Sequence, residues 1–125
     1  MARDEMIAGV GFREGASPAS LLDALARAGA GDLRHVAVPG VKARHPAVQT
    51  LRQFGYRITE ISAGALVAPQ TLTDSAAARA AHGTGSVAEA CALAALGAGA
   101  YLAAPRSISA DGMATAALAR TGEPT

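Results

Sequence analysis

The segment Gly9-Val10-Gly11-Phe12-Arg13-Glu14-Gly15 combines three glycines with one arginine. It directly follows a short apolar run that begins at Met6, and it precedes an alanine- and leucine-rich segment with helical spacing. Glycines let a backbone turn sharply and approach a ligand closely, and the first free N–H groups of a helix favour an anion. The Arg13 guanidinium adds a planar fork that matches a carboxylate or a phosphate. The pattern predicts anion binding at a strand-to-helix turn.

This glycine spacing does not match the dinucleotide-binding fingerprint, because G-x-G-x-x-x-G is one residue longer. Asp32 precedes the second apolar run, so it does not stand where an acidic residue would hold a ribose. A small nucleotide-binding module therefore remains an alternative that rests on the glycine turn alone. A tight turn with an ordinary exposed arginine remains open as well.

Three further polar features fall at loops or at helix starts. Lys42 follows the second apolar run, Arg106 follows the penultimate expected strand, and Gly83-Thr84-Gly85-Ser86 precedes a helical segment. In parallel α/β sheets, the ends at which strands lead into helices gather on one side, and ligands bind there. Convergence of these features with Arg13 would form a cationic, glycine-lined cleft. The alternative is that each is an ordinary solvated residue.

Ser86 and Glu89 stand at the start of the apolar segment 87–96, at the spacing of a capping box. In that motif each side chain accepts a hydrogen bond from the backbone N–H of the other residue, which accounts for both without a ligand. A functional role would use the backbone N–H groups of Gly85 and Ser86 as an anion cradle. The two roles are compatible.

Residues typical of nucleophilic or metal chemistry form no recognisable set. Cys91 occupies an apolar helical position, where a small buried thiol is the usual explanation, and Ser86 has no base fixed by spacing. The histidines lack metal-ligand spacing and are expected at the surface or at helix ends: His35, His45 and His82. No catalytic residue, metal site or cofactor is assigned. The candidate ligand-binding residues are Gly9, Gly11, Arg13, Gly15, Lys42, Gly83, Gly85, Ser86, Glu89 and Arg106.

The elements that must position these residues alternate between strands and helices. Helices are expected from Ser17-Pro18 to about residue 28, from His45-Pro46 to 54, over 75–82 and over 87–96, with a short or irregular one at 63–68. Strands are expected at 6–10, 33–38, 56–61, 101–104 and 113–119, with a loop over 106–112. This order predicts a single three-layer α/β/α domain, residues 1–125, whose sheet of about five strands is mostly parallel or mixed.

Composition narrows the possible partners. The length of 125 residues predicts one domain. The net charge of +1 indicates no polyanion-binding surface. Two Phe, two Tyr and no Trp leave no stacking platform for nucleic acid. No apolar run is long enough to span a membrane. The charged segment from Met1 to Met6 is too short for a signal peptide, and we expect a cytoplasmic protein. Residues 1–5 and 121–125 are expected to fray.

Together these motifs resemble the cobalamin-biosynthesis family of CobE and the C-terminal domain of CbiG. Its G-x-G-C-R-x-G turn is matched from Gly9 to Gly15, its lysine after the second strand by Lys42, and its G-x-x-S-V-A-E-A-x-A-L stretch by Gly83 to Leu93. Its final T-x-A-x-A-R strand is matched by residues 115–120. The resemblance covers nearly the whole chain.

Two departures from the family pattern alter the expected site. Phe12 replaces the usual cysteine, which excludes a thiol at that position. The family's D-x-K-x-x-E pattern has become Gly40-Val41-Lys42-Ala43-Arg44-His45, so both acids are lost. The expected site is therefore more cationic than in the family and suits an acidic ligand.

The resemblance implies a role in corrin ring biosynthesis, whose intermediates are macrocycles with several carboxylate side chains. We therefore expect an accessory protein that binds a precorrin or corrinoid intermediate, with other enzymes of the pathway as further possible partners. An alternative is a hydrolase of a lactone-type bond in such an intermediate, in which Lys42 or Arg13 would stabilise an oxyanion. The third alternative is the nucleotide-binding module.

Overall fold

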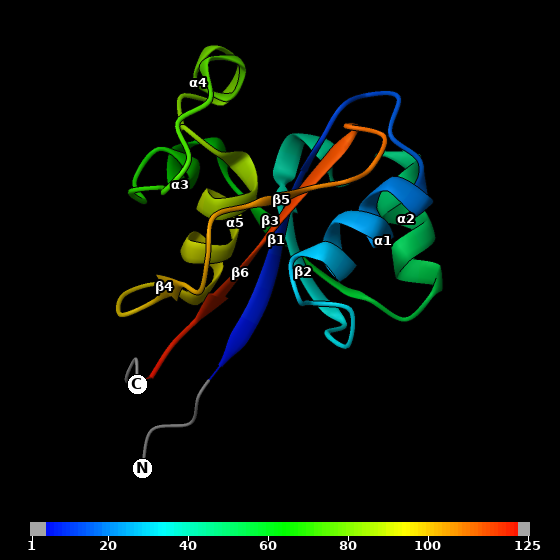
Figure 1. Ribbon diagram of the computed structural model, residues 1–125, viewed down its shortest axis with the longest axis horizontal. Helices are drawn as coiled ribbons and strands as arrows, with labels where there is room; N and C mark the ends of the chain where they lie inside the picture. The colour runs from blue at the N-terminus through cyan, green and yellow to red at the C-terminus, as the bar shows by residue number, and fades with distance from the viewer. Residues whose placement is uncertain (1–4, 123–125) are drawn as a thin grey trace.

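The structure is a computed structural model that describes residues 5–122. Its strands are β1 (Met6–Phe12), β2 (His35–Pro39), β3 (Arg57–Ile61), β4 (Tyr101–Leu102), β5 (Ser107–Ile108) and β6 (Ala114–Arg120). Its helices are α1 (Pro18–Arg27), α2 (Pro46–Gln53), α3 (Ala63–Leu66), α4 (Ala76–His82) and α5 (Val87–Leu96), with a 3-10 turn, η1, at Gly40–Lys42. Figure 1 shows the sheet between two groups of helices, which confirms the α/β fold expected from the sequence.

The six strands form one mixed sheet in the order β3-β2-β1-β6-β4, and β5 also pairs with β6. The β1–β2 and β2–β3 pairs are parallel, whereas β6 runs antiparallel to β1, β4 and β5. The long β1–β6 ladder runs from Met6 opposite Arg120 to Phe12 opposite Ala114. The carboxyl end of β1 therefore lies beside the amino end of β6.

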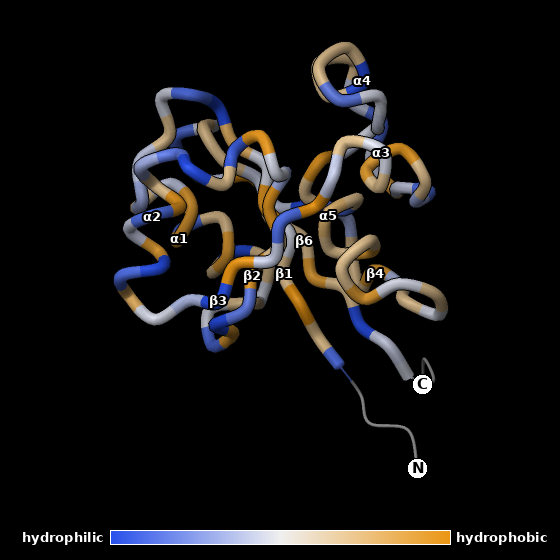
Figure 2. The backbone as a smooth tube through the Cα atoms, turned by 180° about the vertical axis from the view of Figure 1, so that it is seen from behind, coloured by the Kyte–Doolittle hydropathy of each residue, from blue (hydrophilic) through white to orange (hydrophobic). Residues whose placement is uncertain are grey.

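Side chains of β1 alternate between two apolar layers. Ala8 and Val10 face α1 and α2 in one buried cluster, and Ile7 faces α5 in the other. In Figure 2 the hydrophobic colour marks β1 in the centre of the molecule, between the two groups of helices. Alanine-rich α5 buries all its residues from Val87 to Ala92, as expected for a helix seated directly on a sheet.

The helix boundaries follow the signals in the sequence. Ser17 caps α1 in a reciprocal capping box with Ser20, and Pro18 is its first residue. His45 caps α2, because its Nδ1 accepts a hydrogen bond from the Ala47 N–H at 3.1 Å. Gly55, with a φ of +94°, follows α2 in the left-handed conformation that glycine adopts without strain.

The irregular regions differ from expectation in three places. The turn after β2 is the 3-10 turn η1, and the strand expected at 101–104 is reduced to two residues. The loop expected at 106–112 contains the short strand β5. All three are short elements, for which sequence patterns carry the least information.

The ends of the described chain are paired with each other. Glu5 N–H donates to the Thr121 hydroxyl at 3.0 Å, and Thr121 N–H donates to the Glu5 carbonyl at 2.9 Å. The expected fraying is therefore wrong for these two residues, and residues 1–4 and 123–125 lie outside the described range. Within that range, each helix is too short or too polar to cross a lipid bilayer.

Candidate functional site

A cleft of about 350 Å³ opens at the carboxyl end of β1. The turn after β1, the turn η1 and the amino end of β6 supply part of its wall, while α4 and the first residue of α5 supply the rest. Its lining residues include Gly11, Phe12, Arg13, Lys42, Ser75, Ala77, Ala78, Ala81, His82, Val87, Arg106, Met113, Ala114 and Thr115. We call it the cationic cleft.

Four of the residues expected at a ligand site meet in this cleft: Gly11, Arg13, Lys42 and Arg106. Topology explains why. Parallel β1 and β2 deliver Arg13 and Lys42 to the same edge of the sheet, since both follow a carboxyl end. Arg106 arrives differently, from the segment that leads into β5 beside the amino end of antiparallel β6.

Lys42 is held in place from two sides. Its Nζ donates to Glu14 Oε2 at 3.3 Å and lies 5.2 Å from the centroid of the Phe12 ring, within the range of a cation–π contact. Only 20% of the Lys42 side chain is exposed, against 86% for Glu14. Because water surrounds the Glu14 carboxylate, this ion pair contributes at most about 1 kcal/mol, and Lys42 stays available to a competing anion. Among residues 5–122, Arg13 and Arg106 take part in no ion pair.

His45 contacts the Phe12 ring and the turn that follows β1, next to Lys42. Its ring makes an edge contact with Phe12, with centroids 4.9 Å apart, and its Nε2 lies 2.6 Å from the Glu14 carbonyl. Because Nδ1 accepts from Ala47 N–H, Nε2 must carry the proton and donate to that carbonyl. The ring therefore orients the turn after β1 and the Phe12 ring next to Lys42.

The hydroxyl groups that line the cleft are engaged with the backbone. Ser75 Oγ accepts from the Ala78 N–H at 3.3 Å and caps α4. Thr115 Oγ1 donates to the Gly11 carbonyl at 3.3 Å and ties β6 to β1. These contacts give both residues a structural role at the rim.

The other two glycines of the first motif lie outside the cleft. Gly9 of β1 is buried against α5, where an added Cβ atom would lie 2.1 Å from the Ala88 carbonyl oxygen. Gly15 is exposed, and an added Cβ would meet only the end of Met113, at 3.1 Å. The geometry therefore gives Gly9 a role in helix packing.

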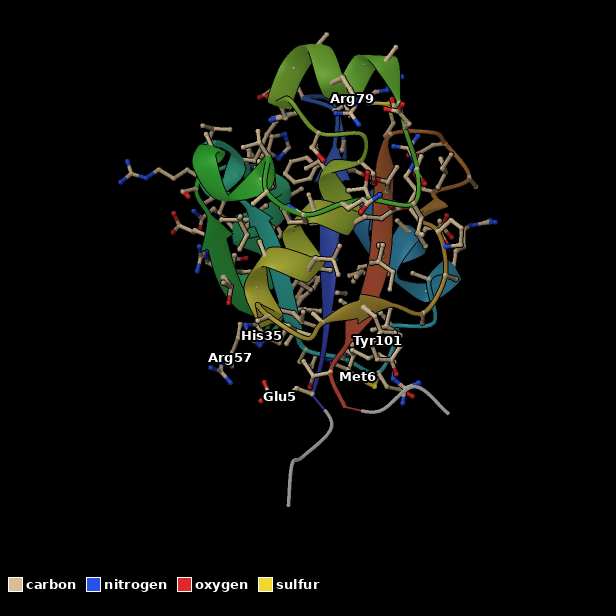
Figure 3. The ribbon with its side chains drawn as sticks, turned by 90° about the vertical axis from the view of Figure 1, so that its left-hand side faces the viewer. Glu5, Met6, His35, Arg57, Arg79 and Tyr101 are labelled. Carbon is tan, nitrogen blue, oxygen red and sulfur yellow. The ribbon has the colours of Figure 1, made fainter. Side chains whose placement is uncertain are left out.

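The Gly83-Thr84-Gly85-Ser86 segment divides between two environments. Gly83 and Gly85 line a second, polar cavity of about 220 Å³ together with Asp74 and Arg79, whose side chains form an ion pair at 2.6 Å. Arg79 lies on α4, at the end of the molecule opposite Met6 and Tyr101 (Figure 3). Gly83 ends α4 with a φ of +73°, and Ser86 is fully buried.

The expected capping box of α5 forms only in its first half. Ser86 Oγ accepts from the Glu89 N–H at 3.3 Å. The Glu89 carboxylate turns instead to two loops, where it accepts hydrogen bonds from Leu72, Thr73 and Arg106. Burial raises the pKa of Glu89, and these hydrogen bonds outweigh that effect, so the pKa lies below its ordinary value.

Sequence reasoning missed several residues of the cleft. Phe12 was treated as the loss of a cysteine, yet its ring supports Lys42. His82 was assigned to a helix end, which is where it lies, but there it also lines the cleft. Ser75 and Thr115 carry no local signal for a site, because only the sheet order and the position of α4 bring them to the rim.

A larger cavity of about 780 Å³ lies elsewhere, between α3, the second half of α5 and β4. Its lining is apolar apart from Gln70 and the Tyr101 hydroxyl, and it includes no charged side chain. Carboxylates bind where charged donors can pair with them, so the cationic cleft is the better candidate for an acidic ligand.

Comparison with known proteins places this geometry in context. Residues 6–119 match the model of the family described as Cobalamin synthesis G C-terminus. The chain is similar to the crystal structure of CobE, a protein from the cobalamin (vitamin B12) biosynthetic pathway, at 30% identity and a TM-score of 0.79 over 99% of this chain and 95% of that chain. It is also similar to the cobalamin biosynthesis protein chiG from Agrobacterium tumefaciens str. C58, at 29% identity and a TM-score of 0.67 over 95% of this chain and 100% of that chain. No curated protein matches the chain.

Proposed function

The chain belongs to the cobalamin synthesis G C-terminus family, and we propose that it binds a carboxylate-rich precorrin or corrinoid intermediate in the cationic cleft. One observation carries this proposal. Arg13, Lys42 and Arg106, from three separate loops, line one cleft together with the apolar surfaces of Phe12 and Met113. Such a site pairs with carboxylates through charge-assisted hydrogen bonds and contacts a ring through its apolar groups.

The size of the cleft sets the mode of binding. At about 350 Å³, it lies at the small end of the range for ligand sites, which is about 300–1,000 Å³. A macrocycle with several carboxylates therefore inserts one edge, and the rest of the ring projects outward. That arrangement would leave the outer edge accessible to another enzyme of the pathway.

Binding is preferred over catalysis because of the state of the polar groups in the cleft. The Ser75 and Thr115 hydroxyls, which could serve as nucleophiles, already contact the backbone. Hydrolysis of a lactone-type bond remains the second candidate, since Lys42 and Arg13 could stabilise an oxyanion.

A titration with a matched pair of corrins tests the proposal. One corrin carries free carboxylates on its periphery, and the other has the same ring with those groups converted to amides. Binding is measured from the visible spectrum of the corrin and by calorimetry. We expect saturable binding of the carboxylate form and at least tenfold weaker binding of the amide form. Equal binding of the two forms, or no binding at tens of micromolar, would contradict the proposal.

The hydrolase alternative is tested in the same samples. A lactone-bearing corrin is incubated with the protein, and its mass is measured over time. An unchanged mass supports binding alone, whereas a gain of one water per ring would establish hydrolysis. The nucleotide-binding alternative is tested by measuring the melting temperature of the protein with and without adenine and nicotinamide nucleotides.

A further inference from the structure

Glu89 is the most deeply buried acidic group in the described residues. Its exposed fraction is 0%, although it lies in the first turn of α5, only two residues after Val87 at the cleft. An isolated charge in such a place is costly unless hydrogen bonds compensate it. Within residues 5–122, the carboxylate forms no ion pair. Backbone N–H groups and one hydroxyl therefore compensate the charge.

Each carboxylate oxygen of Glu89 accepts two hydrogen bonds. Oε1 accepts from the backbone N–H groups of Leu72 and Thr73, at 2.7 and 2.9 Å. Oε2 accepts from the Thr73 hydroxyl at 2.6 Å and from the Arg106 N–H at 2.8 Å. One side chain thus joins two loops that are separated by more than 30 residues in the sequence.

One of these loops lines the cationic cleft, and the other leads into α4, which lines it. Arg106 lines the cleft itself. Thr73 lies two residues before Ser75, which caps α4, and α4 lines the cleft with Ala77, Ala78, Ala81 and His82. None of the α4 residues is buried, and Figure 1 shows α4 standing apart at one end of the molecule. The flanking segments therefore determine where this wall lies.

We propose that Glu89 is a positioning residue of the cleft, which fixes Arg106 and the α4 wall at a set spacing through a single buried carboxylate. The inference rests on the proposed function, because the cleft must bind an acidic ligand for this spacing to matter. Glu89 itself does not contact the ligand. It acts through the two loops that it holds.

Glu89→Gln is the sharpest test, because an amide offers one acceptor oxygen and one donor group. With its oxygen in place of Oε1, the amide keeps both backbone N–H groups of Leu72 and Thr73. Its NH₂ then replaces Oε2, where the Thr73 hydroxyl can rotate to accept but the Arg106 N–H faces another donor. The opposite orientation would set the NH₂ against two backbone donors. The substitution therefore releases Arg106 selectively.

The expected results are specific to this geometry. In E89Q, the amide hydrogen of Arg106 should exchange at least tenfold faster than in the parent, with a smaller change at Leu72. Affinity for the carboxylate-bearing corrin should fall about tenfold. In an Arg106→Ala background, E89Q should lower affinity by less than twofold, because the residue through which it acts is already gone.

Thr73→Val gives a second route that does not depend on the folding of E89Q. It removes only the hydroxyl contact with Oε2 and loosens the α4 side, so affinity should fall a few fold in both the parent and the R106A background. A purely structural role would lower the unfolding free energy in E89Q and T73V and leave both affinities unchanged. That result would overturn the inference. Equal losses from E89Q with and without Arg106 would overturn it as well.

The proposed function and this inference can fail separately. If the parent binds neither corrin, the proposed function fails, and the inference falls with it. If the parent binds the carboxylate form and E89Q binds it equally well, the inference alone is overturned.

Discussion

Gly9 of β1 and Ala88 of α5 are in direct backbone contact. A Cβ atom built at position 9 would lie 2.1 Å from the Ala88 carbonyl oxygen and 2.6 Å from the Ala92 nitrogen. The absence of a side chain therefore lets α5 rest on the central strand. This contact also sets the amino end of α5, with Val87, at the cationic cleft.

Gly9→Ala should destabilise the fold, because the atoms in the way are backbone atoms that cannot rotate aside. Overpacking in a core typically costs about 1–3 kcal/mol, and we expect a loss at or above the upper end of that range. Chemical unfolding at equilibrium measures this loss of unfolding free energy.

Gly64→Ala in α3 is the matched control, since an added Cβ there meets nothing within 4 Å. The control should be neutral or more stable by up to about 1 kcal/mol. Equal stability of both variants would contradict the close contact.

The helices could be predicted from the sequence because short local signals mark their ends. Ser17-Pro18 and Ser86 were identified as starts of α1 and α5, and both helices begin there. The direction of β6 could not be predicted, because its pairing with β1 joins residues about a hundred positions apart, such as Gly9 and Ala117. No local pattern encodes a contact of that range.

Part of the lining of the candidate cleft could be predicted, from Gly11 at the end of β1 and from the cations that follow strands. The convergence of Arg13 and Lys42 could be expected because parallel strands deliver their carboxyl ends to one edge. The α4 wall was missed, since this alanine-rich helix buries no residue and its sequence gives no sign of what it covers. Glu89 was assigned a local partner by its capping-box spacing, but its carboxylate binds loops 16 and 17 residues away.

Arg13→Ala should weaken binding of the carboxylate-bearing corrin while the fold remains intact. The side chain is exposed and has no ion pair among residues 5–122, so the unfolding free energy should change by no more than about 0.5 kcal/mol. A lost charge-assisted hydrogen bond costs about 1.5–3 kcal/mol, which is about a ten- to hundredfold loss of affinity. Calorimetric titration measures this loss.

Two further variants sharpen the Arg13 experiment. Arg13→Lys should restore only part of the affinity, because an ammonium group lacks the planar fork of a guanidinium. Arg52→Ala on α2 removes an exposed arginine that does not line the cleft, and it should bind the corrin like the parent. Unchanged affinity in a normally folded R13A protein would show that Arg13 does not contact the ligand.

Cys91 should be unreactive in the native protein. Its side chain has an exposed fraction of 0%, and burial raises the pKa of the thiol to about 12. The thiolate is the nucleophile that attacks the reagent, and the reagent must reach it, so reaction requires α5 to open. With a disulfide reagent at pH 8, we expect labelling about a hundredfold or more slower than in guanidinium chloride. Cys91→Ala provides the blank, and equally fast labelling of folded and unfolded protein would contradict the seating of α5 on β1.

His35 should make stability fall as the pH drops below about 6.5. Burial lowers the pKa of His35, and the positive charge of Arg57 on the neighbouring strand lowers it further from the ordinary value of 6.5. Figure 3 shows the two residues at the same edge of the sheet, and the His35 ring is hydrogen-bonded to Thr59. As the pH falls through 6.5, the unfolded chain takes up a proton at this position more readily than the folded protein, which favours unfolding.

His35→Gln removes this titration while His45 and His82 remain in both proteins. The stability of the parent relative to H35Q, measured by urea unfolding at pH 7.5, 6.5 and 5.5, should therefore decline across that series. A constant difference at the three pH values would show that His35 takes up its proton equally well in the folded and unfolded states.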